Sequence, residues 1–243
     1  AGFTSVNFVL IYGLPLQTIQ SIYRTIAEVI QLQPDRIAFY SYAHVPWTSK
    51  AQRLFDESHL PSAEEKLQLY IHGQHLFLAA GYHDIGMDHF SLPGDELYTA
   101  KQQGRLHRNF MGYTVQDSGM LLGLGVSAIS DTGNAFVQNH KTLHTYYNDI
   151  NSGNLPVSRG YFLNKEDIIF RNYIKNITCK GYTAFQTDDL PVLKDTCFPR
   201  LEEPVADGLV ELNDRQLKLT AKGHYFIRNI CSAFDLHLQR QHH

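Results

Sequence analysis

The sequence predicts an α/β fold in two parts. Residues 1–135 are expected to form part of a parallel sheet with helices, in a barrel or a doubly wound arrangement, and residues 136–243 a mostly helical, winged-helix-like domain. The first part is predicted from a continuous apolar run at residues 8–12, typical of parallel strands covered on both faces, and from a strand–helix–strand order with short connections. The second is predicted because helices, a hairpin and a last helix follow residue 134.

The first predicted strand lies in NFVLIYGLP (7–15) and ends at a glycine–proline turn. A helix follows, capped by Thr18 and running to about Gln33, with apolar residues at three- and four-residue steps along one face. Pro34 ends this helix, and RIAFYSYAHVP (36–46) is the second predicted strand. The order strand, helix, strand predicts a parallel βαβ unit.

A second helix is predicted from Ser62, which forms a capping box with Glu65, to about Ala80. We expect a third strand in YHDIGMDHF (82–90) and a fourth in LLGLGVSAISDTG (121–133). These elements would give three crossovers in succession, as in part of a barrel or a doubly wound sheet.

In the second part, helices are predicted over residues 140–152 and 164–180, and an asparagine N-cap begins the latter. LVELNDRQLKLT (209–220) is predicted as a hairpin with its turn at residues 213–214. Thr220 is expected to cap the last helix.

The composition argues against several classes of function. The formal net charge is -3 and basic residues are not strongly clustered, so we expect no nucleic-acid binding, even by the winged-helix-like domain. No long apolar run or secretory leader pattern is present, so no membrane span is expected. Cys179, Cys197 and Cys231 are far apart and form no CxxC pair, which indicates a reducing cytoplasm.

HDIGMDH (83–89) combines two histidines with two aspartates, but their spacing matches no zinc signature. Alternate residues of a strand also face opposite sides, so these side chains would not converge and we expect no metal site. Asp88 and His89 are expected at the C-terminal end of a strand, where α/β barrels place their working residues. We interpret these two residues as one wall of a substrate pocket.

HRNFMGYTVQ (107–116) brings hydrogen-bonding side chains together with aromatic surface, as a pocket for a large, flat, carboxylated ligand requires. Arg108 would pair with a carboxylate, and Phe110 or Tyr113 would stack on the ligand. Plain connecting loops have similar compositions. The glycine-rich stretch at 123–130 lacks dinucleotide-binding spacing and predicts close backbone approach instead. Without a known catalytic motif, no catalytic residue is assigned.

Six segments spread over nearly the whole chain carry a family resemblance: LIYGLP (10–15), YAHVP (42–46), GMDHF (86–90), LHRNFMGYT (106–114), LGLGVSAIS (122–130) and TAKGHYFIRNICSAFD (220–235). Together they resemble the oxygen-independent coproporphyrinogen III oxidases, a radical S-adenosylmethionine family of haem biosynthesis. In the related haem chaperones, the equivalent of 108–114 is closer to Arg-His-Asn-x-x-Tyr-Trp. The Phe-x-Gly-Tyr-Thr of this chain is more similar to the oxidases.

The resemblance implies that the chain holds the C-terminal part of a radical-SAM (β/α)6 partial TIM-like barrel. The parent enzyme would decarboxylate two propionates of coproporphyrinogen III to vinyl groups, giving protoporphyrinogen IX, with S-adenosyl-L-methionine and a [4Fe-4S] cluster. The family's CxxxCxxC cluster motif is absent from this chain, so we expect the chain alone to be inactive and unable to bind the cluster. The parent is expected to be cytoplasmic and monomeric, and the fragment to self-associate.

The resemblance also implies cofactor contacts for Val9, Tyr42, Ala43, Phe110, Met111 and Ile129, the last three near a second S-adenosylmethionine. The family normally has aspartate at the position of Val9 and often glutamine at that of Met111, so each change removes a polar contact. Either both changes are tolerated or this copy has lost full activity. The alternative function is a haem- or porphyrin-binding relative without oxidase activity. A DNA-binding regulator would need a basic recognition helix, which the sequence does not show.

Overall fold

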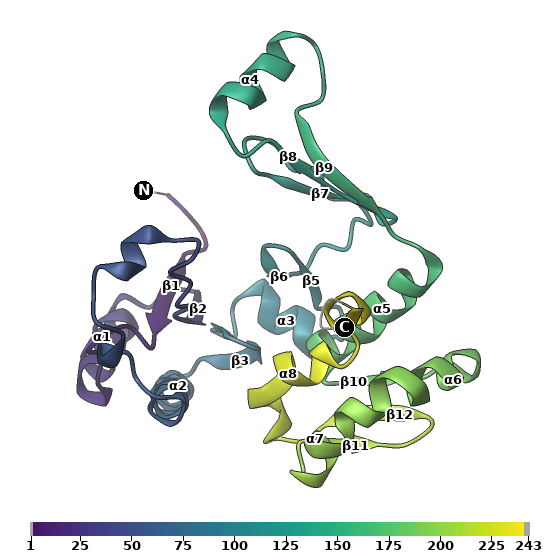
Figure 1. Cartoon of the computed structure of the whole chain (residues 1–243). Coiled ribbons are helices and arrows are strands. Elements are labelled where there is room, and N and C mark those ends of the chain that lie inside the picture. The colour runs from purple at the N-terminus through teal and green to yellow at the C-terminus, as the bar shows by residue number, and fades with distance from the viewer. Residues whose placement is uncertain (1, 241–243) are drawn as a thin grey trace. The chain divides into compact units, whose positions relative to one another are not determined.

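The computed structural model describes residues 2–240 (Figure 1). The chain packs as two compact units, one ending at Arg105 and the other beginning at Leu106. Both contain helices and strands, so the predicted α/β character is confirmed. The domain border predicted between residues 135 and 136 falls at the start of a strand within the second unit. The division into two compact units does not test the predicted domain border, which stays a prediction.

The first unit holds one four-stranded sheet in the order β1-β2-β4-β3. Its helices and strands are β1 (Asn7–Tyr12), α1 (Ile19–Leu32), β2 (Arg36–Ser41), α2 (Ala63–Ala79), β3 (His83–Gly86), β4 (His89–Ser91) and α3 (Glu96–Gln102), with short 3-10 turns η1 (Lys50–Arg53) and η2 (Glu57–His59). Strands β1 and β2 are parallel, and α1 connects them. The predicted βαβ unit is therefore confirmed.

The sequence predicted a single strand, the third in the chain, over residues 82–90, and this prediction is wrong. The segment forms two short antiparallel strands, β3 and β4, and β4 also runs antiparallel to β2. The chain reverses because Gly86 and Met87 both take positive φ angles, of 147° and 49°. A positive φ is uncommon for a non-glycine residue, so the sequence pattern gave no signal for this turn. Only one of the expected crossovers is present in the sheet.

Strand β1 lies at the edge of the sheet, and its residues are partly buried on one face and exposed on the other. Val9 is 58% exposed and Ile11 43% exposed, whereas Phe8, Leu10 and Tyr12 pack against the core. The apolar run predicted a strand covered on both faces, and within this chain that prediction is wrong. A run of apolar residues does not reveal whether a neighbouring element is present to cover it.

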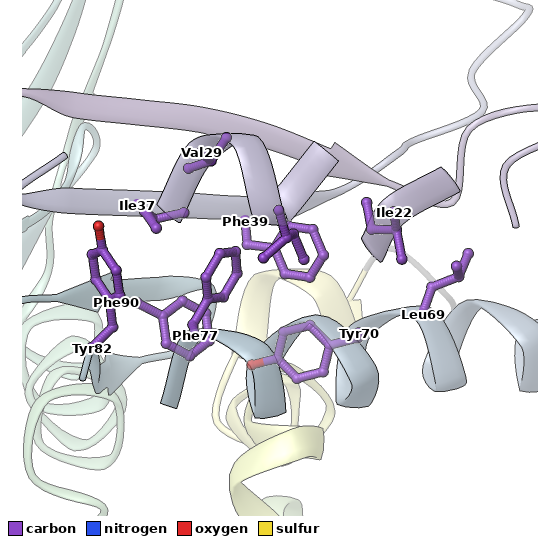
Figure 2. Close-up of a cluster of buried hydrophobic side chains, with 10 residues drawn as sticks. Ile22, Val29, Ile37, Phe39, Leu69, Tyr70, Phe77, Tyr82 and Phe90 are labelled. Carbon is purple, nitrogen blue, oxygen red and sulfur yellow. The ribbon is translucent and has the colours of Figure 1, made fainter. Parts of the chain in front are cut away.

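The core of the first unit lies between the sheet and helices α1 and α2 (Figure 2). The Phe77 ring centroid lies 5.4 Å from that of Phe39 and 5.1 Å from that of Phe90. Tyr82 donates a hydrogen bond from its hydroxyl to the carbonyl oxygen of Pro34, at 2.8 Å. The aromatic packing holds one face of the sheet against the helices. The opposite face of the sheet does not take part in this core.

Over its described residues, 106–240, the second unit contains three small sheets with the orders β5-β6, β7-β8-β9 and β10-β12-β11. Its helices and strands are β5 (His107–Asn109), β6 (Gly112–Thr114), β7 (Ile129–Asp131), β8 (Ala135–Asn139), α4 (Leu143–Asn151), β9 (Val157–Phe162), α5 (Lys165–Lys180), β10 (Tyr182–Ala184), α6 (Leu190–Val192), α7 (Glu202–Ala206), β11 (Val210–Leu212), β12 (Gln216–Leu219), α8 (Ile227–Ser232) and α9 (Leu236–Arg240). Short 3-10 turns are η3 (Thr187–Asp189), η5 (Phe198–Leu201) and η6 (Gly223–Phe226), and η4 (Leu193–Cys197) is a π-helical turn.

The prediction of a fourth parallel strand over residues 121–133 is also wrong. Leu121 makes an isolated antiparallel bridge to Asp131, and only Ile129–Asp131 form a strand, β7, which is antiparallel to β8. Between them Gly125 and Ser127 take φ angles of 99° and 63°, which turn the chain back on itself. The apolar content of the segment predicted a strand, but the positive φ angles of these two residues impose a loop.

The locally encoded elements agree with the sequence. Thr18, Ser62 and Asn164 each accept a hydrogen bond from the third residue of the helix that follows, and each completes a capping box. These residues lie where the sequence predicted that α1, α2 and α5 begin. Strands β11 and β12 form the predicted hairpin. The Thr220 hydroxyl accepts a hydrogen bond from the Gly223 amide at 3.0 Å, but the 3-10 turn η6 follows it and the helix α8 begins only at Ile227.

Candidate functional site

Val9, Ala38 and His89 lie in one row across three neighbouring strands. Val9 pairs with Ala38 between β1 and β2, and Ala38 pairs with His89 between β2 and β4. Paired residues of adjacent strands present their side chains on the same face of a sheet. This row lies on the face opposite the α1–α2 core, where Val9 is the most exposed of the three.

Tyr40 joins the same face two residues beyond Ala38. Its hydroxyl lies 3.3 Å from Nε2 of His89, and the two rings meet edge to face with centroids 5.7 Å apart. The phenol and the imidazole thus form a hydrogen-bonded pair beside Val9. Such a pair can bind a carboxylate or another polar group placed over the sheet.

The parallel strands β1 and β2 end at the same edge of the sheet, where ligands of α/β proteins bind. After β1 the chain turns at Gly13, which has a φ of 81°. Gln17 holds this turn, because its Oε1 accepts a hydrogen bond from the Gly13 amide at 2.6 Å and its Nε2 donates to the Ile11 carbonyl oxygen at 3.2 Å. The turn after β1 is therefore held by Gln17, which lies just before α1.

After β2 the chain continues into residues 42–45, which contain the predicted cofactor residues Tyr42 and Ala43. The Tyr42 amide donates to the Tyr12 carbonyl oxygen at 2.8 Å, which joins this segment to the end of β1. The carbonyl oxygen of Ala43 accepts a hydrogen bond from Nε2 of Gln52 at 3.0 Å. Both predicted residues therefore lie at the carboxyl edge, while Val9 lies on the adjoining face.

Asp88 and His89 do not lie at the end of one strand, as the sequence predicted. Asp88 belongs to the turn between β3 and β4, and His89 begins β4. The turn nevertheless lies toward the carboxyl end of β2, because the Phe39 amide donates to the Asp88 carbonyl oxygen at 2.7 Å. Asp88 is buried, whereas His89 is partly exposed on the sheet face. Of the two, His89 is the one placed to contact a ligand.

In the second unit, residues 107–116 contain the β5–β6 hairpin, for which the sequence showed no clear period. Phe110 and Met111 form its tip and are 49% and 84% exposed. Asn109 closes the turn, because its Oδ1 accepts a hydrogen bond from the Met111 amide at 2.8 Å. The Phe110 ring meets that of Phe136 on β8 edge to face, with centroids 5.1 Å apart. The hairpin therefore presents two large apolar side chains on a fixed turn.

Arg108 and Tyr113 pair across this hairpin. The Arg108 guanidinium carbon lies 5.1 Å from the centroid of the Tyr113 ring, a cation–π distance. Tyr113 is buried, and its hydroxyl donates to the Thr178 carbonyl oxygen at 2.7 Å. Nη1 of Arg108 is buried and has no hydrogen-bond partner among the described residues. Arg108 is thus the member of the pair that retains donor capacity for a ligand carboxylate.

Ile129, the first residue of β7, is partly buried against the glycine-rich segment. A Cβ on Gly123 would lie 2.6 Å from the Ile129 carbonyl oxygen, so only glycine fits there. Asn139 donates from Nδ2 to the carbonyl oxygens of Gly123 and Gly125, at 3.2 and 2.8 Å. The predicted close backbone approach is confirmed at Gly123, whereas a Cβ on Gly125 would meet no atom within 4 Å.

A polar cavity of about 190 Å³ lies between the β5–β6 hairpin and α5. Asp117 lines it and has His107 Nδ1 at 3.3 Å and Lys175 Nζ at 3.2 Å. Burial and the charge of Lys175 lower the pKa of His107. Burial raises the pKa of Asp117, but the hydrogen bond from Lys175 and the charge of His107 outweigh it and leave that pKa below its usual value. The cavity therefore holds charges of both signs.

A larger cavity of about 450 Å³ lies nearby in the same unit. Its walls are mainly aromatic and aliphatic and include a few charged or titratable side chains: Phe136, Tyr161, Leu163, Asp167, Phe170, Arg171, Ile174, Phe234, Asp235, Leu236 and His237. Arg171 lines both cavities and makes a two-pronged ion pair with Asp131. Nothing in the sequence pattern indicated this cavity, because residues 234–237 close it against β8, β9 and α5, which lie far earlier in the chain.

The cysteines and the possible metal ligands do not gather into a site. Within residues 2–240 no group of three histidine, cysteine, aspartate or glutamate side chains is arranged to hold a metal ion. Cys179, Cys197 and Cys231 are all buried as free thiols. Burial raises the pKa of Cys197 to about 11 and that of Cys231 to about 12, so these thiols stay protonated at neutral pH.

Searches among known proteins point to one family. No model of a protein family matches the chain. The chain is 42% identical to the oxygen-independent coproporphyrinogen III oxidase of Escherichia coli (strain K12) over 99% of its own length and 54% of that protein. It is 39% identical to the oxygen-independent coproporphyrinogen III oxidase of Thermostichus vulcanus over 99% of its own length and 76% of that protein.

A solved structure shows similarity to the same family. The coproporphyrinogen III oxidase of Escherichia coli, described as a radical SAM enzyme, superposes with a TM-score of 0.88 at 40% identity. The match covers 96% of this chain and 55% of that chain. The chain thus spans about half the length of the first relatives it matches. Because 76% of the Thermostichus vulcanus protein is covered at 39% identity, this chain belongs to the family of oxygen-independent coproporphyrinogen III oxidases.

Proposed function

We propose that this chain is the C-terminal part of an oxygen-independent coproporphyrinogen III oxidase that converts two propionates of coproporphyrinogen III into vinyl groups, giving protoporphyrinogen IX. The observation that carries this proposal is the 42% identity to the Escherichia coli oxidase over 99% of the chain. Residues 1–135 then contribute to a radical-SAM (β/α)6 partial barrel, and residues 136–243 to a winged-helix-like domain. The one parallel βαβ unit supports the barrel assignment.

S-adenosylmethionine, together with a [4Fe-4S] cluster in the full-length protein, would supply the radical that removes hydrogen from the substrate. The site fits this cofactor, because the loops after β1 and β2 meet at one edge of the sheet and are held in place by hydrogen bonds. Tyr42 and Ala43 bind the cofactor there, and Val9 adds an apolar contact from the sheet face. Phe110, Met111 and Ile129 form the contacts for a second S-adenosylmethionine.

The substrate carboxylates require cationic or hydrogen-bonding partners. Arg108 binds one propionate through its guanidinium, whose buried Nη1 has no partner among the described residues. His89, held by Tyr40, orients a propionate over the sheet face. The buried Tyr113 supports Arg108 through the contact between its ring and the guanidinium, and the buried Asp88 precedes His89 in the turn between β3 and β4.

The cluster is held, in this proposal, by a part of the full-length protein that this chain does not contain. Cluster ligands must be thiolates, whereas burial raises the pKa of the thiols of Cys179, Cys197 and Cys231. These cysteines therefore do not fit a cluster site, and the chain alone is expected to be inactive. The cytoplasmic location and the monomeric state of the parent stay predictions. Separately, no helix among the described residues is long and apolar enough to cross a membrane.

The test is an anaerobic assay of the full-length protein, reconstituted with iron and sulfide and supplied with coproporphyrinogen III and S-adenosylmethionine. A matched variant carries Val9→Asp. Formation of protoporphyrinogen IX by the unmodified protein supports the proposal and shows that valine is tolerated. Turnover by Val9→Asp alone would show that this copy has lost a cofactor contact. Porphyrin binding without turnover by either protein would favour the porphyrin-binding alternative.

A further inference from the structure

Residues 42–45, at the carboxyl edge of the first unit's sheet, are held by two side chains from other elements. Nζ of Lys66, in α2, donates a hydrogen bond to the Tyr42 carbonyl oxygen at 2.7 Å. Gln52, in η1, donates from Nε2 to the Ala43 carbonyl oxygen at 3.0 Å and accepts from the Val45 amide at 2.5 Å. The backbone of this segment is therefore held at three of its four residues.

Lys66 also supports the neighbouring loop. A Cβ on Gly13 would lie 2.5 Å from Cε of Lys66 and 3.1 Å from its Cγ, so the lysine stem packs directly against the turn after β1. Burial lowers the pKa of Lys66, which is the cost of placing an ammonium group there. One side chain thus touches both loops that form the carboxyl edge.

The same contacts leave part of the segment open for a ligand. Among the residues that the structure describes, the amide N–H groups of Ala43 and His44 have no hydrogen-bond partner. Backbone amides on a fixed loop orient a ligand well, because they lose little entropy when it binds. The carboxyl edge is also where α/β proteins place such ligands.

We propose that Lys66 and Gln52 are positioning residues for S-adenosylmethionine: they hold residues 42–45 so that the amides of Ala43 and His44 can bind it. This inference rests on the proposed function. It assigns a role to two side chains that do not themselves contact the reacting atoms. Losing a charge-assisted hydrogen bond typically weakens binding about tenfold, so that effect is expected when Lys66 is replaced.

The test compares three variants of the full-length, reconstituted protein. Lys66→Met and Gln52→Leu each remove one support of the segment. Lys101→Met is the matched control, because Nζ of Lys101 makes the same kind of contact, at 2.6 Å to the Asp84 carbonyl oxygen, but at β3. The measurements are the Kd for radiolabelled S-adenosylmethionine by equilibrium dialysis, the KM for coproporphyrinogen III, and the unfolding temperature.

We expect Lys66→Met and Gln52→Leu to raise the Kd for S-adenosylmethionine about tenfold while the KM for coproporphyrinogen III stays within about twofold. Lys101→Met should leave both constants unchanged. A Kd unchanged in both Lys66→Met and Gln52→Leu, or raised equally by Lys101→Met, would overturn this inference alone. If the unmodified protein fails to bind S-adenosylmethionine, the proposed function and the inference fall together.

Discussion

Gly73 on α2 lies directly against the ring of Phe39 on β2. A Cβ at position 73 would come within 2.5 Å of Cε1 of Phe39 and 3.1 Å of Cδ1 of Ile26. Phe39 and Ile26 are both fully buried, so neither side chain can move aside easily. The close contact between α2 and the sheet therefore depends on a glycine inside a helix.

Gly73→Ala is predicted to destabilise the first unit, although alanine normally favours a helix. Overpacking of a dense core costs about 1–3 kcal/mol, more than the helix propensity of alanine returns. Urea unfolding of the chain measures the effect. Gly94→Ala is the control, because a Cβ at Gly94 meets no atom within 4 Å. Equal stability of the two variants would contradict the packing described for Phe39.

Asn139→Ala is predicted to loosen the glycine-rich segment before β7. The substitution leaves the carbonyl oxygens of Gly123 and Gly125 without their bonds from Asn139, at a cost of about 1–3 kcal/mol. Hydrogen exchange of residues 123–131 measures this change. The control is Asn148→Ala on the exposed face of α4. Unchanged exchange in Asn139→Ala would show that the segment is held by other contacts.

The stability of the second unit is predicted to fall between pH 10 and pH 12. Burial and the hydrogen bond to Asp189 raise the pKa of Tyr173 from 10.0 to about 12. The unfolded chain therefore loses the Tyr173 proton at a lower pH than the folded chain, which favours unfolding as the pH rises through this window. The slope from this one group is at most about 1.4 kcal/mol per pH unit.

Urea unfolding at pH 9.5 and pH 11 tests this prediction against Tyr173→Phe. The variant loses the bond to Asp189 at every pH, but its stability should change less between the two pH values. Tyr182→Phe, at an exposed position, serves as the control. An identical pH dependence in Tyr173→Phe and the unmodified chain would contradict the assignment.

The isolated chain is predicted to self-associate through the exposed face and free edge of β1. Val9 and Ile11 are exposed on an edge strand, a surface that readily pairs with another chain. Ile11→Lys should shift the chain toward monomer in sedimentation velocity. Leu124→Lys, which removes a 91% exposed leucine in the second unit, should not. A monomer at all concentrations without any substitution would rule out this association.

Features encoded by nearby residues were predictable from the sequence. The N-caps at Thr18 and Asn164, the capping box at Ser62 and the hairpin at residues 209–220 depend on residues a few positions apart. The turn at Met87 was missed because a positive φ at methionine has no sequence signal. Local propensity acts between residues that are close in the sequence, and this limits which turns and strands a sequence predicts.

The position of some candidate site residues in the fold could be compared with the sequence, although their roles stay predictions. The resemblance gave Tyr42 and Ala43, which lie at the carboxyl edge, and Val9, which lies on the adjoining face. It gave no signal for Lys66 or Gln52, because their contacts to residues 42–45 join elements that are separate in sequence. The row Val9, Ala38 and His89 likewise depends on strand register, which a single sequence does not fix.

The most direct test of the central claim is the carbon dioxide released by the full-length protein from coproporphyrinogen III labelled in its propionate carboxyl groups. The reconstituted protein should release one labelled carbon dioxide for each propionate that becomes a vinyl group, and only when S-adenosylmethionine is present. No release, from a protein that holds its cluster and binds S-adenosylmethionine, would contradict the assignment of this chain to an active coproporphyrinogen III oxidase.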